Sequence, residues 1–167
     1  NMLKNNTLFF IDSAQTVGCI GNFDVTNLRC NFMSFNGSKW LCGPMGTGLF
    51  YCNKKSHELL EPMTIGGESA MIYNNTNLAF KDIPDKFQTG FRNYVGMVGL
   101  ESSVTYLLKF GMENIRKKNL YLSNLLREEL SKIKNIILYR PENPQERTSI
   151  VSFNIDGHDP QIIVKKL

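Results

Sequence analysis

The amino-acid sequence predicts an α/β fold that begins with part of a mostly parallel sheet and continues into part of a small α+β unit. Up to Cys52, short apolar segments alternate with loops, one of which is rich in glycine. Further along, two long segments carry apolar residues at helical spacing. Short apolar strands and amphipathic helices in this arrangement are typical of domains in which helices cover a buried sheet.

Three strands are expected in the first part of the chain. Residues 7–11 form an aromatic-rich apolar run that stops at Asp12, and its length and composition indicate a strand buried on both faces. Residues 32–35 and Gly48–Cys52 predict the next two strands. Between them, the glycine-dense segment 43–48 predicts a turn that permits positive φ angles and close approach of the backbone.

Residues 61–88 give weak signals and predict a long loop. They contain a pair of glycines at 66 and 67, a polar cluster at residues 74–77 and Pro84, all of which are typical of turns. Loops of this length in compact domains tend to be functional or mobile.

Two amphipathic helices are expected in the second half. The apolar residues of the first share one helical face, and they are Met97, Leu100, Val104, Leu107 and Leu108. Gly111 follows at the position of a C-terminal cap. The second helix begins at Glu113, and its buried stripe is Ile115, Leu122, Leu126, Leu130 and Ile133. Because the composition changes near Gly111, we expect a partial large domain at residues 1–105 and a partial small domain at residues 106–167.

Two strands and a short helix complete the predicted small domain. Ile136–Tyr139 and residues 149–154 have the composition of strands. Asp159 is then expected to cap a helix that has Pro160 at its first position. The sequence stops at Leu167, and so short a helix is marginal by itself. We therefore expect that the sequence is a piece cut from a longer protein.

Composition and charge argue against several classes of function. The net charge is +4, and where basic residues are densest, at residues 115–134, they alternate with acidic and polar ones, which favours a solvated helix over a nucleic-acid-binding face. No apolar run approaches the length of a membrane span. The four cysteines include no CxxC pair and have no histidine at metal-ligand spacing, which disfavours a metal site. Without a signal peptide they indicate reduced thiols and a cytoplasmic location.

The residues that carry chemistry are Asp12 and Lys39. The motif Asp12-Ser13-Ala14-Gln15 follows the first strand, and the loop after the second strand holds Lys39. The carboxyl ends of neighbouring strands are where open α/β sheets bind ligands. A carboxylate and an amine there suit pyridoxal 5'-phosphate (PLP), whose ring nitrogen and aldehyde they would hold. Each residue alone indicates only an ordinary turn aspartate or surface lysine; their order along the chain favours the cofactor.

This ordered set resembles the class V aminotransferases among the fold-type I PLP enzymes, a group that holds cysteine desulfurases, selenocysteine lyases and isopenicillin-N-epimerase-like proteins. The family has Asp-x-Ala-Gln on one strand and Ser-Gly-His-Lys before a Gly-Pro-x-Gly-x-Gly turn. Residues 9–15 and 35–51 match this order and spacing, and the similarity continues through residues 66–68 and 87–90 into the helices. The resemblance implies part of a fold-type I large domain followed by part of its small domain.

The resemblance also implies a role for each matching residue. Asp12 would hold the pyridinium nitrogen, and Gln15 would hydrogen-bond the phenolic oxygen of the ring. Lys39 would be the Schiff-base residue and the base that moves the α-proton of the substrate. The family's serine and histidine before the lysine help to bind the phosphate; here Asn36 and Ser38 replace them, so hydrogen-bond donors remain but the imidazole is gone.

A second departure concerns the phosphate. After the segment that matches residues 87–90, the family commonly has a threonine that reaches the phosphate of the partner subunit in a homodimer. This chain has Phe91 there, followed by Arg92. Arg92 is expected to serve instead as a phosphate or carboxylate ligand.

The implied function is PLP-dependent chemistry on an amino acid, with desulfuration of cysteine favoured. An aminotransferase or an epimerase of the same family is the nearest alternative, because these reactions share their first steps. In cysteine desulfurases the cysteine that carries the persulfide is expected beyond Leu167, and Cys42 is interpreted as a packed thiol. A different alternative is a truncated fragment without catalysis that serves at most as an interaction module.

Overall fold

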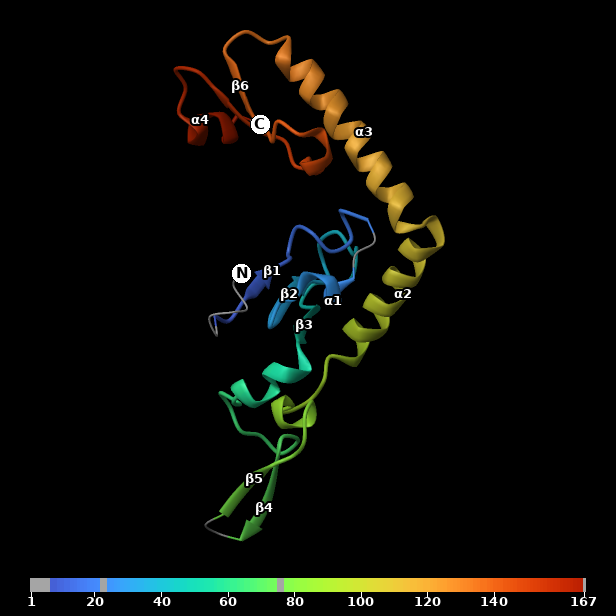
Figure 1. Ribbon diagram of the computed structural model, residues 1–167, viewed down its shortest axis with the longest axis vertical. Helices are drawn as coiled ribbons and strands as arrows, with labels where there is room; N and C mark the ends of the chain where they lie inside the picture. Colours follow the sequence, from blue (N-terminus) through green and yellow to red (C-terminus); the bar gives the residue numbers. More distant parts are fainter. Residues whose placement is uncertain (1–6, 22–23, 75–76, 167) are drawn as a thin grey trace. The chain divides into compact units, whose positions relative to one another are not determined.

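The computed structural model describes residues 7–21, 24–74 and 77–166, and it has a mixed α/β architecture (Figure 1). Two compact units are present, each described here by itself. The first holds the described residues of Asn1–Gln15 and Asp24–Thr105. The second holds those of Thr16–Phe23 and Tyr106–Leu167.

The first unit contains a three-stranded sheet in the order β1-β2-β3. Strand β1 (Phe10–Asp12) runs parallel to β2 (Phe32–Asn36), and β3 (Gly48–Cys52) runs antiparallel to β2. The predictions for the second and third strands are confirmed, with β2 extended by one residue. The small core around β2 is formed by Cys30, Phe32, Met33 and Leu41.

The prediction for the first strand was wrong in two respects. β1 begins at Phe10 and includes Asp12, so it lies later in the chain than expected. It is also not buried on both faces, because Phe10 is 51% exposed and the preceding Leu8 is 55% exposed. Within the described residues β1 pairs only with β2, and it therefore forms an edge of this sheet.

Three short helical segments of the first unit were not predicted. Helix α1 (Val25–Leu28) is capped by Asp24, whose side chain accepts a hydrogen bond from the Thr26 amide. The 3₁₀ segments are η2 (Lys54–Leu59), capped by Asn53, and η3 (Asp85–Phe87). Such short elements show no helical period in the sequence, so the only signal for α1 and η2 was the capping side chain, and η3 has no side-chain cap.

The expected long loop at residues 61–88 contains a β-hairpin, and that prediction was wrong. Strands β4 (Ala70–Asn74) and β5 (Asn77–Phe80) pair antiparallel, with Asn74 opposite Asn77. Asn74 and Asn77, the described residues of the predicted polar cluster, therefore lie opposite each other at the ends of the two strands. If the polar segment 74–77 of the sequence is interpreted as a hairpin connection, the apolar residues on either side of it predict both strands.

The two long helices are confirmed, but the stripe expected to be buried on the second is not buried, because Leu122 is 47% and Leu126 48% exposed. Helix α2 spans Tyr94–Phe110 and α3 spans Met112–Ser131. Gly111, with a φ of 80°, separates them, and its amide donates to the carbonyl of Leu108. Glycine adopts this left-handed conformation at little cost, which explains its position between two helices.

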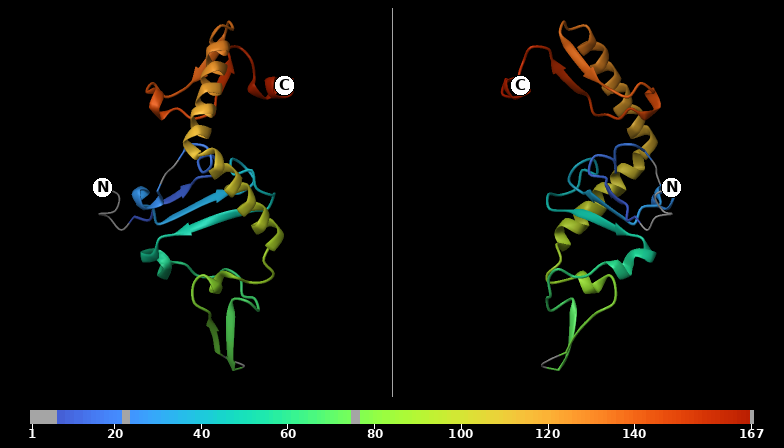
Figure 2. Two further views of the ribbon diagram at one scale, coloured as in Figure 1. Left: turned by 90° about the vertical axis from the view of Figure 1, so that its right-hand side faces the viewer. Right: turned by 60° about the vertical axis from the view of Figure 1, so that its left-hand side comes forward.

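In the second unit, β6 (Ile136–Tyr139) pairs antiparallel with β7 (Ser152–Ile155) beside α3 (Figure 2). The 3₁₀ segment η4 (Pro144–Glu146) lies between the strands. The unit ends with α4 (Pro160–Val164), whose predicted cap is confirmed because the Asp159 side chain accepts from the Gln161 amide at 2.8 Å.

β7 begins three residues later than expected, and Arg127 of α3 binds the backbone just before it. Its guanidinium donates to the carbonyl oxygens of Thr148 (3.0 Å) and Ile150 (2.7 Å) and to the hydroxyl of Ser123 (2.9 Å). Arg127 is only 4% exposed, and its Nε has no hydrogen-bond partner among the described residues. Burial, together with the charges of Arg147 and Arg140, lowers the pKa of Arg127.

The described part of Thr16–Phe23 is attached to the second unit by two polar contacts. The Sγ of Cys19 lies 2.8 Å from the Oγ of Ser149. Arg116 of α3 donates to the carbonyl oxygen of Ile20 at 2.7 Å. This segment directly follows the predicted site residue Gln15, and no sequence pattern predicted its contacts with Ser149 and Arg116.

Candidate active site

The carboxyl ends of β1 and β2 lie at the same end of the sheet, and the predicted site residues are found there or in the loops that follow. The two strands are parallel, and Asp12, the last residue of β1, lies opposite Ser34 in the register. β2 ends at Asn36, three residues before Lys39. Because the carboxyl ends of parallel strands meet at the same edge, the loops that carry Asp12 and Lys39 begin side by side.

Backbone hydrogen bonds hold the loop that follows Asp12. The amide of Ser13 donates to the carbonyl of Ser34 at 2.8 Å, and Ser13 is 1% exposed. Oδ1 of Asp12 accepts from the amide of Ala14 at 3.0 Å, which forms a local turn. The carboxylate of Asp12 has no ion pair with any described residue, so it is available to an incoming cation.

The loop that carries Lys39 is closed by three backbone hydrogen bonds. The Gly37 amide donates to Thr47 at 2.9 Å, the Gly43 amide to Gly37 at 2.8 Å, and the Cys42 amide to Lys39 at 2.9 Å. The turn predicted at residues 43–48 is confirmed by a turn at Met45 and Gly46, where Gly46 has a φ of 76°. The Lys39 side chain is exposed, and among the described residues its amine has neither a hydrogen-bond partner nor an ion-pair partner.

A side-chain hydrogen bond joins the two loops. Nε1 of Trp40 donates to Oε1 of Gln15 at 2.9 Å. Trp40 is half-buried and Gln15 is exposed. The sequence predicted Gln15 as a site residue but not its contact with Trp40, because nothing in the spacing reveals which side chain an indole N–H will meet.

The close packing of the lysine loop predicts that Gly43→Ala will be destabilising. A Cβ at Gly43 would lie 2.9 Å from the carbonyl oxygen of Gly37 and 2.7 Å from Cδ1 of Leu100. The leucine can move, but the carbonyl cannot without opening the loop, so we expect a loss of roughly 1–3 kcal/mol. Urea unfolding of the full-length protein measures it. Gly67→Ala is the control, because no atom lies within 4 Å of its Cβ position; equal losses in both variants would contradict the argument.

Asn36 and Ser38, the predicted phosphate ligands, lie at the end of β2 and in the loop that carries Lys39, respectively. Asn36 is exposed at the end of β2, where it pairs with Gly48 of β3. Ser38 is half-buried. Neither side chain hydrogen-bonds another described residue, so both retain donors for a ligand.

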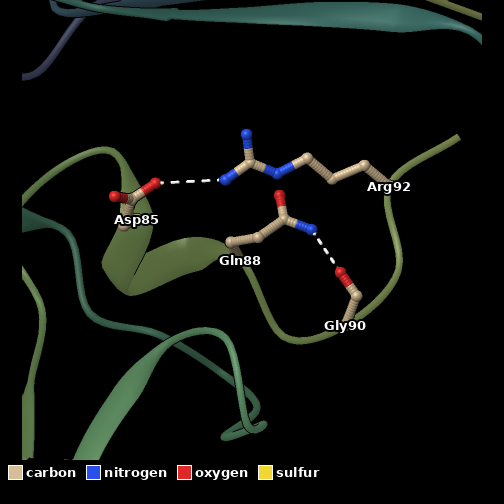
Figure 3. Close-up of polar contacts among 4 residues, drawn as sticks. All are labelled: Asp85, Gln88, Gly90 and Arg92. Carbon is tan, nitrogen blue, oxygen red and sulfur yellow. Dashed lines mark hydrogen bonds and ion pairs between the residues drawn. The ribbon is translucent and has the colours of Figure 1, made fainter. Parts of the chain in front are cut away.

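Arg92 belongs to a different group of side chains. Its Nη2 lies 3.2 Å from Oδ1 of Asp85, and Nε2 of Gln88 donates to the carbonyl of Gly90 (Figure 3). Arg92 also lines a cavity of about 480 Å³ together with Gly67, Glu68, Thr89, Gly90, Phe91 and Tyr94. No hydrogen bond or ion pair joins Arg92 to Asp12, Gln15 or Lys39 within the described chain. The structure thus joins the two loops through the contact between Gln15 and Trp40, and no described contact links Arg92 to either loop.

The cysteines do not resemble activated nucleophiles. Cys19 and Cys30 are buried, and Cys42 is exposed. Cys52 lines an apolar cavity of about 560 Å³, and burial raises the pKa of its thiol, which disfavours the reactive thiolate.

The described residues contain no group of side chains suited to a metal ion. None of the helices described is long and apolar enough to cross a membrane.

The sequence profile of the aminotransferase class-V family matches residues 1–167, which is the whole chain. The chain belongs to the aminotransferase class-V family. The resemblance carried by the Asp12 and Lys39 motifs is thereby confirmed.

Relatives of this class-V chain are named as cysteine desulfurases. It is 33% identical over 160 residues to the probable cysteine desulfurase of Methanothermobacter thermautotrophicus, covering 96% of this chain and 39% of that protein. It is 30% identical over 164 residues to the probable cysteine desulfurase of Pyrococcus abyssi, covering 98% of this chain and 40% of the relative. The class-V chain therefore spans about 40% of the length of these relatives.

Solved structures agree with the family. The class-V chain superposes on the cysteine desulfurase of Thermococcus onnurineus NA1 with a TM-score of 0.88 and 26% identity, covering 98% of this chain and 40% of that structure. The cysteine desulfurase CsdA of Escherichia coli gives a TM-score of 0.85 at 22% identity, with 98% and 39% covered, and shows the same fold. The predicted α/β fold of fold-type I is confirmed.

Proposed function

We propose that the full-length protein containing this chain is a PLP-dependent enzyme that acts on an amino acid, with desulfuration of cysteine as its reaction. One observation carries the proposal: the loops holding Asp12 and Lys39 leave one edge of the sheet and are joined by the hydrogen bond between Trp40 and Gln15. The cysteine desulfurase names of relatives with 30% and 33% identity support the choice of reaction.

The donor set in the two loops fits PLP. The Lys39 amine, which has no partner among the described side chains, suits the aldehyde. The Asp12 carboxylate, likewise without a cationic partner, suits a protonated ring nitrogen. The amide of Gln15 and the hydroxyl of Ser38 supply neutral donors for the phenolic oxygen and the phosphate. Each polar group of the cofactor would therefore meet a side chain of matching charge or hydrogen-bonding type.

The residues of this chain would divide the chemistry among them. When bound, PLP supplies an electron sink for the negative charge that develops on the α-carbon of the substrate. Asp12 would hold a proton on the ring nitrogen through a charge-assisted hydrogen bond. Lys39 would first hold the cofactor and then, once the substrate amine replaces it, accept the α-proton on its free amine. The closed hydrogen bonding of the lysine loop limits how far that amine can move from its starting position.

The proposed overall reaction is balanced with one acceptor thiol. Cysteine gives up its sulfur, the C–S bond breaks, and the acceptor thiol becomes a persulfide while the carbon skeleton leaves as alanine. No external oxidant is needed: the β-carbon of cysteine is reduced when its bond to sulfur becomes a bond to hydrogen, and the sulfur is oxidised when it joins the acceptor thiol. None of the four cysteines of this chain is assigned as the acceptor.

The test is to incubate the full-length protein with PLP, cysteine and a reducing thiol and to measure alanine and sulfide. Equal amounts of both support desulfuration. A keto acid in place of alanine would indicate an aminotransferase, and inversion of the amino acid without loss of sulfur would indicate an epimerase. A protein that never acquires a visible absorption band with PLP would contradict the proposal and favour a non-catalytic interaction module.

We further propose that the protein is a cytoplasmic homodimer in which Arg92 binds the phosphate held by the partner subunit. Four free thiols are consistent with a reducing compartment. Arg92 is 41% exposed and Asp85 56% exposed at their side chains, so the pair is worth less than about 1 kcal/mol and can open for an anion.

Arg92→Gln is expected to raise the Kd for PLP by about tenfold or more, because a charged hydrogen bond to phosphate contributes roughly 1.5–3 kcal/mol. Asp85→Asn is the matched variant, since it removes the competing carboxylate, and it should leave the Kd unchanged or lower it. Equilibrium dialysis of PLP against the full-length variants measures both values. A Kd for Arg92→Gln within twofold of the unmutated value would remove Arg92 from the phosphate site.

A further inference from the structure

Trp40 follows the proposed cofactor lysine, and its only described side-chain hydrogen bond is to Gln15. The distance from Nε1 of Trp40 to Oε1 of Gln15 is 2.9 Å. An indole N–H can only donate, and of the two ends of a side-chain amide only the oxygen can accept. The orientation of the Gln15 amide is therefore dictated by chemistry: its oxygen must face Trp40.

This orientation decides what the amide offers to a ligand. With Oε1 engaged by Trp40, the two N–H donors of Nε2 have no partner among the described residues. The phenolic oxygen of PLP is an acceptor that carries negative charge, so it requires a donor. A Gln15 amide rotated by 180° would present its own oxygen to that acceptor, and the two oxygens would repel each other.

We propose that Trp40 is a positioning residue of the cofactor site: its indole N–H fixes the Gln15 amide so that the amino group, and not the oxygen, meets the phenolic oxygen of bound PLP. The inference rests on the proposed function and concerns how its site is organised. Trp40 touches neither the cofactor nor the substrate in this role; it acts through Gln15.

The expected change in the Kd for PLP depends on how exposed the hydrogen bond between Trp40 and Gln15 is. Gln15 is exposed, so water can replace part of what Trp40 provides. Removing a neutral hydrogen bond of this kind typically costs about 0.5–1.5 kcal/mol, which corresponds to roughly a two- to tenfold change in Kd. The amino group of Gln15 also stabilises the deprotonated phenolic oxygen of the lysine-bound cofactor. Loss of this hydrogen bond should therefore raise the pH midpoint of the visible band, by at most about one unit.

The experiment is a double-mutant cycle in the full-length protein with Trp40→Phe, Gln15→Ala and the double variant. Phenylalanine keeps an aromatic ring but removes the donor. We expect Trp40→Phe to raise the Kd for PLP roughly two- to tenfold and to shift the pH midpoint of the visible band upward. In the Gln15→Ala background, Trp40→Phe should change neither quantity, because Trp40 acts only through the amide.

Gln15→Glu adds a second check, since a carboxylate still accepts from Trp40 but cannot donate to the phenolic oxygen. It should raise the Kd and the pH midpoint at least as much as Gln15→Ala does, because its negative charge also repels the phenolic oxygen. Equal effects of Trp40→Phe with and without Gln15 would show a packing role and overturn the inference, while leaving the proposed function intact. No visible band in the unmutated protein would overturn the proposed function and this inference together.

Discussion

Lys39→Ala is expected to abolish the visible absorption band that the full-length protein forms with PLP, and with it the release of alanine from cysteine. The band requires the amine of Lys39, and its bleaching by borohydride reports the covalent link. Removing a base that also moves a proton costs roughly 10²–10⁴-fold in rate by itself. Absorbance spectra and the alanine assay measure the two effects separately.

Lys54→Ala is the matched control for this experiment. Lys54 is an exposed lysine in η2, outside the two loops of the candidate site. It should keep the band and the activity of the unmutated protein. If Lys39→Ala retained a band that borohydride still bleaches, another lysine would hold the cofactor and the assignment of Lys39 would be wrong.

Arg127→Met is expected to lower the free energy of unfolding by about 3 kcal/mol. The guanidinium is almost fully buried and satisfies the carbonyl oxygens of Thr148 and Ile150 and the hydroxyl of Ser123. Methionine fills much of the volume but donates nothing, so these oxygens lose a charged donor, at roughly 1–3 kcal/mol for each group left buried without a partner. Urea unfolding measures the change.

Arg140→Gln provides the comparison for Arg127→Met. Arg140 is exposed, and its charge is one of those that lower the pKa of Arg127. Removing that charge should leave stability unchanged or raise it by a few tenths of a kcal/mol. If Arg127→Met lost no more stability than Arg140→Gln, the buried arginine would not be what holds residues 148–150.

Regular elements with a clear period were predictable, and those shaped by side-chain contacts were not. β3, β6 and the two long helices follow from apolar spacing that is complete within each segment. Arg127 of α3 binds the carbonyls of Thr148 and Ile150, just before β7. No local pattern predicts that contact, since it depends on which helix packs beside these residues.

In the candidate site, too, the residues in sequence motifs were predictable, and the contacts between distant side chains were not. Asp12 and Lys39 were predicted because they occur at fixed positions in ordered motifs, and the parallel pairing of β1 with β2 gives those motifs a common edge. The contact between Gln15 and Trp40 joins residues 25 positions apart, and sequence spacing alone cannot assign such a bond. The contact between Cys19 and Ser149, 130 positions apart, is harder still to foresee.

The hairpin formed by β4 and β5 has only two strands, and among the described residues no third strand pairs with either of them. An isolated pair of strands is marginally stable in water, because each strand satisfies only one side of its backbone. This hairpin should therefore open locally at a smaller free-energy cost than the β1-β2-β3 sheet, and its amides should exchange with solvent sooner. Like β1 and β3 at the edges of the sheet, β4 and β5 each have one side without a described strand partner, and either side could pair with another strand.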